Sequence, residues 1–458
     1  MTRHFDAIII GAGQAGPSLA GRLTDAGKTV AIIERKLIGG TCVNTGCMPT
    51  KAMVASAYAI HLARRGADYG FSAGPLSVDF AKVMARKETV RVNARTNNET
   101  WLNGMKGCTV IRGHARFEGP KQVRVGDELL SADRIFLNTG GRAAIPDFPG
   151  VTDVPYLTNV SMMDLDTLPP HLLIIGGSYI GLEFAQMFRR FGSQVTIVEK
   201  GPRLIGREDP DVCDAVRDIL EKEGIQVRLN AECIRFLKHG KDVAVGVDCM
   251  EGSPEIVGSH ILLATGRRPN TDDLGLDKAG VETDKRGYIV VDDELRTNVA
   301  GIWAMGDCNG RGAFTHTSYN DFEIVAANLL DNGRRKVSDR ISTYALYIDP
   351  PLGRAGMNET EARKSARKLL IGTRPMTRVG RAVEKGETEG FMKVIVDADT
   401  KEILGASILG TGGDEAVQSI LDVMYAGRPY TTITHAVHIH PTVSELIPTV
   451  FGDLKPAN

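Results

Sequence analysis

Two cysteines near the start of the chain, Cys42 and Cys47, have a spacing that could support redox chemistry. They stand in the stretch GGTCVNTGCMPTK, with four residues between them. The following segment, Thr50–Gly66, predicts a helix with Pro49 in its first turn, so Cys47 would lie near a helix N-terminus that stabilises a thiolate. A zinc site would need a second ligand pair, and a staple closing so short a loop would contribute little. We therefore favour a redox-active dithiol.

The other cysteines lack such a context. The chain has 7 cysteines spread thinly through 458 residues, which argues against the disulfide framework of a secreted protein. Each remaining cysteine is solitary in the sequence, so we expect these residues to be small buried side chains and predict no metal site. They are Cys108, Cys213, Cys233, Cys249 and Cys308.

Charge and hydropathy argue against a nucleic-acid-binding, membrane-spanning or secreted protein. The formal net charge is -1, which gives no electrostatic reason to expect binding to nucleic acid or to an anionic membrane. No apolar run approaches the ~20 residues that a membrane-spanning helix needs. The short apolar run in MTRHFDAIIIGAG leads directly into a glycine turn, unlike the longer run of a signal peptide. We therefore expect a cytoplasmic protein.

An internal repeat organises the chain and supplies the elements that would position the dithiol. Ile8–Arg35 aligns without a gap with Leu173–Lys200. Each copy runs from an apolar strand through a glycine-rich turn and an amphipathic helix to a second apolar strand that ends in an acid. This is the order of a βαβ unit, and it occurs twice. The sequence therefore predicts an α/β fold with two Rossmann-like domains.

The glycine-rich turns have the pattern of dinucleotide-binding sites. The first copy has a complete G-x-G-x-x-G, and the second has Ser178 in place of the middle glycine. The glycines allow a tight turn and close approach of a pyrophosphate, and the terminal acid can accept hydrogen bonds from ribose hydroxyls. Two such sites suggest two different cofactors. The candidate residues are Gly11, Gly13, Gly16 and Glu34 in the first copy and Gly176, Gly181 and Glu199 in the second.

The acid of the second copy bears on the choice of nicotinamide cofactor. A carboxylate at Glu199 favours a free ribose hydroxyl and repels a 2′-phosphate, so the sequence favours NADH over NADPH. Arg203 follows closely and could either meet such a phosphate or form a solvated surface charge. The preference for NADH is therefore a prediction that depends on what Arg203 contacts.

Three stretches give the chain a family resemblance. GGTCVNTGCMPTK, the YIGLE of the second turn and the late HIHPTVSE together resemble the class I pyridine nucleotide-disulfide oxidoreductases, which include dihydrolipoamide dehydrogenase, glutathione reductase and mercuric reductase. The resemblance covers essentially the whole chain. PTK after the second cysteine, FTHTSYNDFEIV and DPPLGRAGMNETEA are most similar to the mercuric-reductase-like branch that includes the reactive-chlorine-resistance flavoproteins.

The resemblance implies a path for electrons. It implies FAD in the first nucleotide site and NAD(P)H in the second, with electrons passing from nicotinamide through FAD to the disulfide. Cys47 would be the flavin-side thiol and Cys42 the interchange thiol that meets the substrate. His440 would be the base for thiol–disulfide exchange, oriented by Glu445, because imidazole titrates near neutrality. His438 lies at the wrong motif position and is expected to pack or support the site.

The resemblance also implies residues around the cofactors. Lys51 and Glu183 would form an ion pair near the flavin, because a buried lysine needs a partner. Tyr179 would be an aromatic gate that covers the flavin until nicotinamide arrives. Asp307 in WAMGDC would hydrogen-bond the FAD ribityl chain. Further cofactor contacts are expected from Thr41, Thr139, Gly140 and Gly266.

The domain boundaries follow from these assignments. The first part of the FAD-binding domain is expected at residues 1–150, the NAD(P)-binding domain at 151–270 and the second part of the FAD-binding domain at 271–340. The alternation in GFMKVIVDADTKEILGASILG predicts an antiparallel sheet with helices over 341–458. The resemblance implies that this α+β part forms a homodimer, in which His440 reaches the cysteine pair of the second subunit.

Three functions remain open from the sequence. The first is an NAD(P)H:disulfide oxidoreductase acting on a small-molecule disulfide or dithiol. The second is a metal-ion reductase of the mercuric type, although no cysteine follows Cys308 to form the additional C-terminal pair of those enzymes. The third is a non-catalytic flavoprotein redox sensor. The second nucleotide motif argues against this function, because a sensor would need no nicotinamide turnover. We favour the disulfide oxidoreductase.

Overall fold

The computed structural model describes residues 2–248 and 254–457, and these divide into two compact units. The two copies of the repeat fall in different units, Ile8–Arg35 in unit 1 and Leu173–Lys200 in unit 2. Each unit is assembled from separate stretches of the chain. Unit 1 consists of Met1–Ala52, Lys82–Ala144 and Gly266–Arg340, and unit 2 of Met53–Ala81, Ile145–Thr265 and Ile341–Asn458.

Unit 1 is built on a mixed sheet in the order β3-β2-β1-β6-β5-β4, with β16 beside β6. Strands β3, β2, β1, β6 and β16 are parallel, and β4 and β5 continue the sheet as an antiparallel hairpin. Ile8, Ile9 and Ile10 are buried, as expected for a central parallel strand covered on both faces. The strands are β1 (Thr2–Ile10), β2 (Val30–Glu34), β3 (Cys108–Arg112), β4 (Ala115–Gly119), β5 (Gln122–Val125), β6 (Glu128–Leu137) and β16 (Ile302–Ala304).

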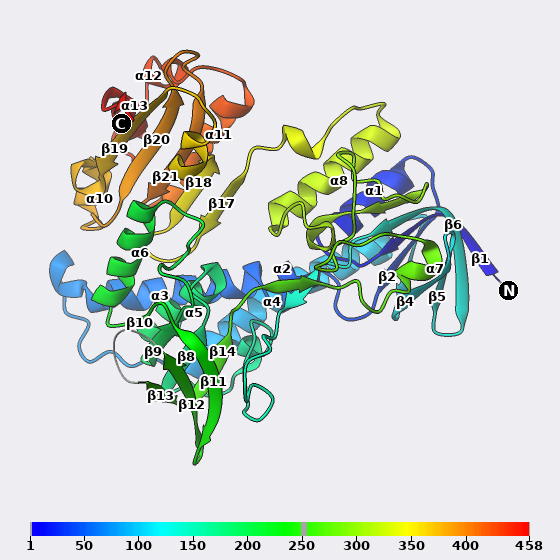
Figure 1. Ribbon diagram of the computed structural model, residues 1–458, viewed down its shortest axis with the longest axis horizontal. Helices are drawn as coiled ribbons and strands as arrows, with labels where there is room; N and C mark the ends of the chain where they lie inside the picture. The colour runs from blue at the N-terminus through cyan, green and yellow to red at the C-terminus, as the bar shows by residue number, and fades with distance from the viewer. Residues whose placement is uncertain (1, 249–253, 458) are drawn as a thin grey trace. The chain divides into compact units, whose positions relative to one another are not determined.

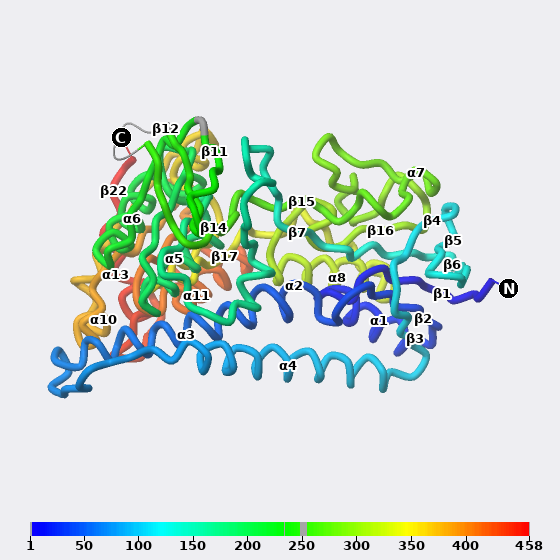
Figure 2. The backbone as a smooth tube through the Cα atoms, turned by 90° about the horizontal axis from the view of Figure 1, so that it is seen from below, coloured from blue at the N-terminus to red at the C-terminus, as the bar shows by residue number. Residues whose placement is uncertain are grey.

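Two helices, α1 and α8, lie side by side on this sheet (Figures 1 and 2). Leu19 of α1 and Val325 of α8 share one buried core with Ile9 of β1. Helix α1 ends before Gly27, whose φ of 74° is left-handed and closes the helix. Two of the helices in unit 1, α3 and α4, extend into unit 2. The helices of unit 1 and the strands of its small second sheet are α1 (Ala15–Asp25), α2 (Gly40–Asn44), α3 (Cys47–Arg64), α4 (Phe80–Gly104), β7 (Gly141–Ala143), β15 (Arg267–Pro269), α7 (Leu276–Ala279) and α8 (Thr315–Leu330).

Unit 2 contains a parallel sheet in the order β10-β9-β8-β14 and an antiparallel sheet in the order β11-β12-β13. Helix α5 buries most of its residues, including Leu182, Phe184 and Phe188, and ends at Gly192 with a φ of 125°. This is the second copy of the βαβ unit. The elements are β8 (His171–Ile175), α5 (Tyr179–Phe191), β9 (Gln194–Val198), α6 (Pro210–Lys222), β10 (Gln226–Arg228), β11 (Glu232–His239), β12 (Asp242–Asp248), β13 (Glu255–Gly258) and β14 (His260–Leu263).

The C-terminal part of unit 2 forms an antiparallel sheet in the order β17-β18-β21-β20-β19-β22 (Figure 1). Strand β21 is buried along its whole length, because α11 packs against it. The elements are β17 (Thr343–Leu346), β18 (Leu352–Gly356), α9 (Glu359–Arg363), β19 (Leu369–Pro375), α10 (Gly380–Glu384), β20 (Phe391–Asp397), β21 (Ile403–Leu409), α11 (Gly413–Tyr425), α12 (Thr431–Thr434), α13 (Ile447–Gly452) and β22 (Lys455–Pro456).

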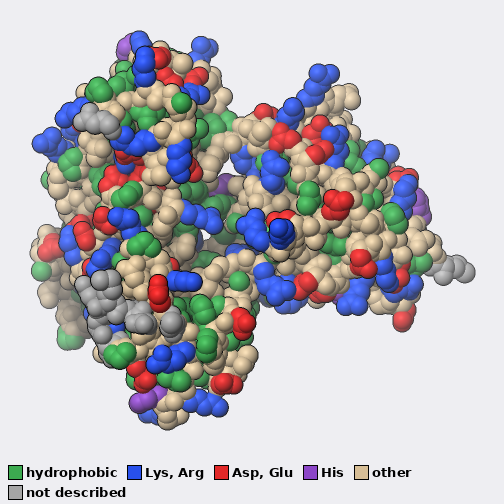
Figure 3. Space-filling view, in the orientation of Figure 1, with side chains coloured by type: hydrophobic (Ala, Val, Ile, Leu, Met, Phe, Trp, Pro, Cys, Tyr) green, Lys and Arg blue, Asp and Glu red, His purple; other side chains and the backbone are tan. Residues whose placement is uncertain are grey.

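These sheets confirm the predicted α/β class, with two Rossmann-like sheets and a C-terminal α+β part. Lys and Arg side chains are interspersed with Asp and Glu on the face shown in Figure 3, as the net charge of -1 leads one to expect. In the described part of the chain, no helix is long and apolar enough to cross a membrane.

Candidate functional site

The cysteine pair is built directly against the first glycine-rich turn. Cys42 lies in the short helix α2, and α3 begins at Cys47. Gly40 has a φ of 60°, and a Cβ at this position would stand 2.9 Å from the Cα of Gly13. The N–H of Gly39 donates to the carbonyl of Ala12 at 2.8 Å. The backbone that carries the cysteines therefore packs on the turn where a dinucleotide would bind.

Both cysteines are thiols in the structure, with Cys42 partly buried and Cys47 exposed. The pKa of Cys42 is raised, first by a hydrogen bond with Cys47 and then by burial, while Thr315 and the charge of Lys51 act in the opposite direction. The Sγ of Cys47 also lies 3.2 Å from the Oγ1 of Thr315. The two cysteine side chains therefore interact, and this interaction favours the protonated form of Cys42.

The space around the glycines of the first turn shows whether the turn has the form of a dinucleotide-binding site. Gly11 has a φ of 106°, and a Cβ there would stand 2.3 Å from the carbonyl oxygen of Asn138. A Cβ on Gly16 would stand 2.4 Å from the carbonyl oxygen of Gly11. The carboxylate of Glu34 accepts hydrogen bonds from the N–H groups of Ala12 at 3.0 Å and Lys36 at 2.7 Å. Only glycine fits these positions, so the turn has the form that a bound pyrophosphate requires.

Other predicted cofactor contacts lie in the same unit. Asp307 follows β16, and burial raises the pKa of its carboxyl, against the effect of Arg267. The Nη2 of Arg267 lies 3.5 Å from Asp307 and donates to the carbonyl of Gly141 at 2.6 Å. The carbonyl of Thr139 accepts from Asn270 at 2.9 Å. The remaining predicted residues here are Thr41, which is exposed in α2, Gly140 with a φ of 64° and Gly266 with a φ of 126°.

The second turn, in unit 2, repeats the construction of the first. Gly176 has a φ of 112°, and a Cβ there would stand 2.4 Å from the carbonyl oxygen of Ala264. A Cβ on Gly181 would stand 2.2 Å from the carbonyl oxygen of Gly176. The carboxylate of Glu199 accepts from the N–H groups of Gly177 at 2.6 Å and Gly201 at 2.7 Å. The turn therefore fits a second dinucleotide by the same test.

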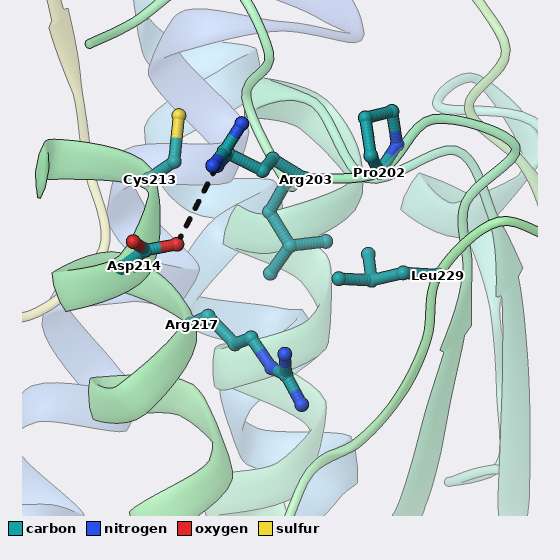
Figure 4. Close-up of a pocket in the computed structure, with 7 residues that line it drawn as sticks. Pro202, Arg203, Cys213, Asp214, Arg217 and Leu229 are labelled. Atoms are coloured by element: carbon teal, nitrogen blue, oxygen red, sulfur yellow. Dashed lines mark ion pairs between the residues drawn. The ribbon is translucent and has the colours of Figure 1, made fainter. Parts of the chain in front are cut away.

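A cavity of about 180 Å³ follows Glu199 in the chain. Figure 4 shows that Arg203 is paired across this cavity with Asp214 of α6, with 3.6 Å between Nε and Oδ1. Arg217 belongs to the same wall and is paired with Glu221 at 3.0 Å. The charge of Arg203, which could bind a 2′-phosphate, is thus already partly neutralised by Asp214. The lining residues are Pro202, Arg203, Leu204, Cys213, Asp214, Arg217 and Leu229.

Two further predicted residues lie on α5. Tyr179 begins the helix, and its hydroxyl donates to Glu208 at 2.9 Å. Glu183 is buried and accepts from the N–H of Tyr347 at 3.1 Å. Lys51 lies in unit 1 and Glu183 in unit 2, so the ion pair expected between them stays a prediction.

The C-terminal motif forms a histidine–carboxylate pair. The Nδ1 of His440 lies 2.9 Å from Oε2 and 3.1 Å from Oε1 of Glu445. The His440 side chain is 80% exposed, whereas that of Glu445 is 15% exposed. The carboxylate therefore fixes the ring through Nδ1 and leaves Nε2 for a proton transfer. His438 is partly buried, with its Nδ1 3.2 Å from the carbonyl of Ala436.

Several sequence expectations concern residues outside these contacts. Cys213 and Cys308 are buried as expected, whereas Cys108 is only partly buried. Cys249 and the side chain of Cys233 lie outside what the structure describes. Within residues 2–248 and 254–457, no group of three or more His, Cys, Asp or Glu side chains is arranged to hold a metal ion.

The sequence did not predict two residues that contact predicted site residues. Thr315 contacts Cys47, and Glu208 contacts Tyr179. Thr315 reaches Cys47 from a segment 268 residues away. Its stretch, FTHTSYNDFEIV, carried the family resemblance but no assigned role. Glu208 precedes α6 and has no motif of its own, so only its contact with Tyr179 reveals it.

Comparison with known proteins agrees with this geometry. Residues 5–321 match the pyridine nucleotide-disulphide oxidoreductase family, and residues 342–451 match the dimerisation domain of that family. A probable pyridine nucleotide-disulfide oxidoreductase of Escherichia coli, RclA, is 37% identical over 98% of this chain and 99% of its own length. A mercuric reductase of Streptomyces lividans is 31% identical, covering 97% of this chain and 94% of its own. A dihydrolipoyl dehydrogenase of Thermus scotoductus is 32% identical, covering 97% and 96%.

Solved structures show the same relationship. The structure of the HOCl-induced flavoprotein disulfide reductase RclA from Escherichia coli superposes with a TM-score of 0.89 at 37% identity, covering 98% of this chain and 99% of that one. Its Cu(II) complex superposes with a TM-score of 0.90 at 36% identity, covering 99% of each chain. The chain therefore belongs to the pyridine nucleotide-disulfide oxidoreductases and is an NAD(P)H-dependent flavoprotein oxidoreductase with a dimerisation domain.

Proposed function

We propose that the chain reduces a small-molecule disulfide through the Cys42–Cys47 pair. The observation that carries this proposal is the contact between the two thiols on a backbone packed against the first glycine-rich turn. Bound FAD would supply two-electron transfer between the nicotinamide and sulfur. The chain's own residues would hold the cofactors and manage the thiols and their protons.

Because the pKa of Cys42 is raised, thiol–disulfide exchange needs a base that takes its proton. A thiolate, not a thiol, attacks a disulfide, so Cys42 must lose its proton to a base. We assign this base to His440, whose ring Glu445 orients. Cys42 then attacks one substrate sulfur and the first substrate thiolate leaves, taking a proton from His440. Cys47 gives its proton to His440 and attacks the Cys42 sulfur of the mixed disulfide. The second substrate thiolate leaves and takes that proton from His440, so that two substrate thiols and the Cys42–Cys47 disulfide result.

The cofactor contacts are part of the same proposal. Residues 1–150 and 271–340 would hold FAD, residues 151–270 the nicotinamide nucleotide, and residues 341–458 would form a cytoplasmic homodimer in which His440 serves the second subunit. Lys51 and Glu183 would pair near the flavin, and Tyr179 would be its gate. The FAD contacts would be Gly11, Gly13, Gly16, Glu34, Thr41, Thr139, Gly140 and Asp307, and the nucleotide contacts Gly176, Gly181, Glu199 and Gly266.

NADH is the favoured electron donor. The Glu199 carboxylate at the end of β9 is placed to accept from ribose hydroxyls, and its charge would repel a 2′-phosphate. The pairing of Arg203 with Asp214 weakens a cation that could offset this repulsion. The variant Asp214→Asn should therefore improve the use of NADPH relative to NADH, as steady-state kinetics with both nucleotides would show.

The test of the proposed function is turnover with a panel of oxidants. Under anaerobic conditions, NADH should bleach the flavin, and a disulfide among lipoamide, glutathione disulfide and small aliphatic disulfides should reoxidise it. Disulfide turnover should be lost in Cys42→Ser. Turnover restricted to Hg(II) or Cu(II) would instead favour a metal-ion reductase, because several relatives of about this similarity are mercuric reductases.

A further inference from the structure

The carboxylate of Glu208 is shared by two tyrosines. The hydroxyls of Tyr179 and Tyr344 both donate to Oε1 of Glu208, at 2.9 Å and 2.6 Å. The two rings meet edge to face, with 5.5 Å between centroids and 82° between planes. Tyr179 starts α5 directly after the second glycine-rich turn, whereas Tyr344 lies in β17 of the C-terminal sheet. One oxygen thus joins the predicted nucleotide site to that sheet.

The other oxygen of the carboxylate faces an arginine. Oε2 of Glu208 lies 3.7 Å from Nε of Arg354, and the two side chains are 0% and 2% exposed. Arg354 also hydrogen-bonds the hydroxyl of Ser407 on β21. Neither Oε2 nor this Nε has a hydrogen-bond partner among the described residues. The carboxylate is therefore buried beside an arginine, and a small shift toward Arg354 would satisfy both atoms.

The backbone around Glu208 is fixed on two sides. The N–H of Ile205 donates to the carbonyl of Gly177 at 2.8 Å, which ties the segment to the glycine-rich turn. The next residue, Asp209, accepts from Lys393 of β20 at 3.2 Å and from the N–H of Glu359 at 2.9 Å. Glu208 therefore offers its carboxylate at a defined place, and its two phenol partners can change without moving the chain.

Both phenols stay protonated donors at neutral pH. Burial, followed by the charge of Glu208, raises the pKa of Tyr179. The same causes raise the pKa of Tyr344 to about 12. Because both hydroxyls compete for one buried oxygen, the loss of one hydrogen bond leaves the carboxylate with the other donor and with Arg354.

We propose that Glu208 is a positioning residue that holds Tyr179 at the mouth of the nicotinamide site, and that Tyr344 lowers the free-energy cost of releasing it. The inference rests on the proposed function, in which Tyr179 moves when nicotinamide binds. A buried carboxylate that loses its only hydrogen bond carries a large penalty. With Tyr344 in place, Glu208 keeps a phenol donor throughout, so the Tyr179 ring moves at small cost.

Two matched variants separate this role from a structural one. In Tyr179→Phe, the hold on the ring is lost, and we expect the FAD-loaded protein to bind NAD⁺ roughly threefold to tenfold more tightly. In Tyr344→Phe, Tyr179 is the one remaining phenol donor to Glu208, so we expect NAD⁺ to bind more weakly by roughly the same factor. Isothermal titration calorimetry gives both dissociation constants without turnover, and thermal unfolding confirms that each variant folds.

Tyr58→Phe is the control, because it removes a phenol that donates to Glu387 at 2.5 Å in the same unit. The control should leave the dissociation constant of NAD⁺ unchanged. Shifts of the same sign in Tyr179→Phe and Tyr344→Phe, or no shift in either, would overturn the role of Glu208 while leaving the proposed function intact. A wild-type protein that binds no NAD⁺ would overturn the proposed function and the inference with it.

Discussion

At the scale of single residues, the reactivity of the cysteine pair depends on the groups that shift the pKa of Cys42. Cys42 and Cys47 lie in contact, and the resulting hydrogen bond and burial raise the pKa of Cys42. The hydroxyl of Thr315 reaches Cys47 at 3.2 Å and acts against that rise. Thr315 therefore stabilises negative charge on the pair, although it comes from the first turn of α8.

The reactivity of Cys42 should report this balance. Only the thiolate is alkylated, so in the reduced protein the rate at Cys42 should keep rising with pH beyond the ordinary cysteine pKa of about 8.5. Thr315→Val should lower the rate at pH 8 by roughly threefold to tenfold, because the pKa of Cys42 rises further. Site-resolved mass spectrometry after timed iodoacetamide treatment measures both effects.

Cys108 is an internal control for this experiment. Burial alone raises its pKa to about 11, and Thr315 is not among the causes. Its alkylation rate should be the same in wild type and in Thr315→Val. A Cys42 rate that levels off near neutral pH, or equal losses at both cysteines, would contradict the account.

At the scale of elements, the two glycine-rich turns show what one chain can reveal without a structure. Gly11 and Gly176 have a φ of 106° and 112°, a local backbone feature that favours glycine, so the repeat predicted both turns and their helices. The contacts of Thr315 and Glu208 arise from packing between distant segments, and no local pattern encodes them. No local pattern predicts the place of Met53–Ala81 either, because this segment continues helix α3 from the cysteine pair but belongs to unit 2.

Replacing Gly11 tests whether the first turn holds FAD. Gly11→Ala places a Cβ 2.3 Å from the carbonyl of Asn138 at a φ of 106°, so the turn must open. We expect the purified protein to carry at least about tenfold less flavin, because the backbone no longer fits a pyrophosphate. The ratio of flavin to protein absorbance measures the loss.

Gly27→Ala is the matched control in the same repeat. Gly27 also has a left-handed φ, of 74°, but a Cβ there meets nothing within 4 Å. Its flavin content should equal that of the wild type, while stability falls by about 1 kcal/mol from backbone strain alone. Equal flavin loss in both variants would show that Gly11 has no specific role in binding.

At the scale of the whole molecule, the proposal requires two chains to complete one site. Residues 342–451 match a dimerisation domain, and they contain the exposed His440 with its partner Glu445. A base that is so exposed in one chain is suited to act on a second chain. The resemblance of the motif HIHPTVSE to the family predicted the His440–Glu445 pair, but the sequence itself cannot show the chain on which the pair acts.

Mixed dimers test this arrangement directly. Cys42→Ser and His440→Ala should each abolish disulfide turnover. After the two variants are unfolded and refolded together, or co-expressed, about a quarter of the wild-type activity should return, because half of the dimers then contain one intact site formed by both chains. No recovery, with mixed dimers demonstrated by native mass spectrometry, would mean that His440 serves its own chain or has no role.

The central claim is that electrons leave the protein through the sulfur–sulfur bond between Cys42 and Cys47. Differential alkylation of the air-oxidised protein, before and after anaerobic addition of NADH, tests it most directly. The account predicts that Cys42 and Cys47 resist alkylation before NADH and that both are labelled afterwards, with no change at Cys108. Free thiols at both positions in the oxidised protein, or flavin reduction that leaves the pair unlabelled, would contradict it.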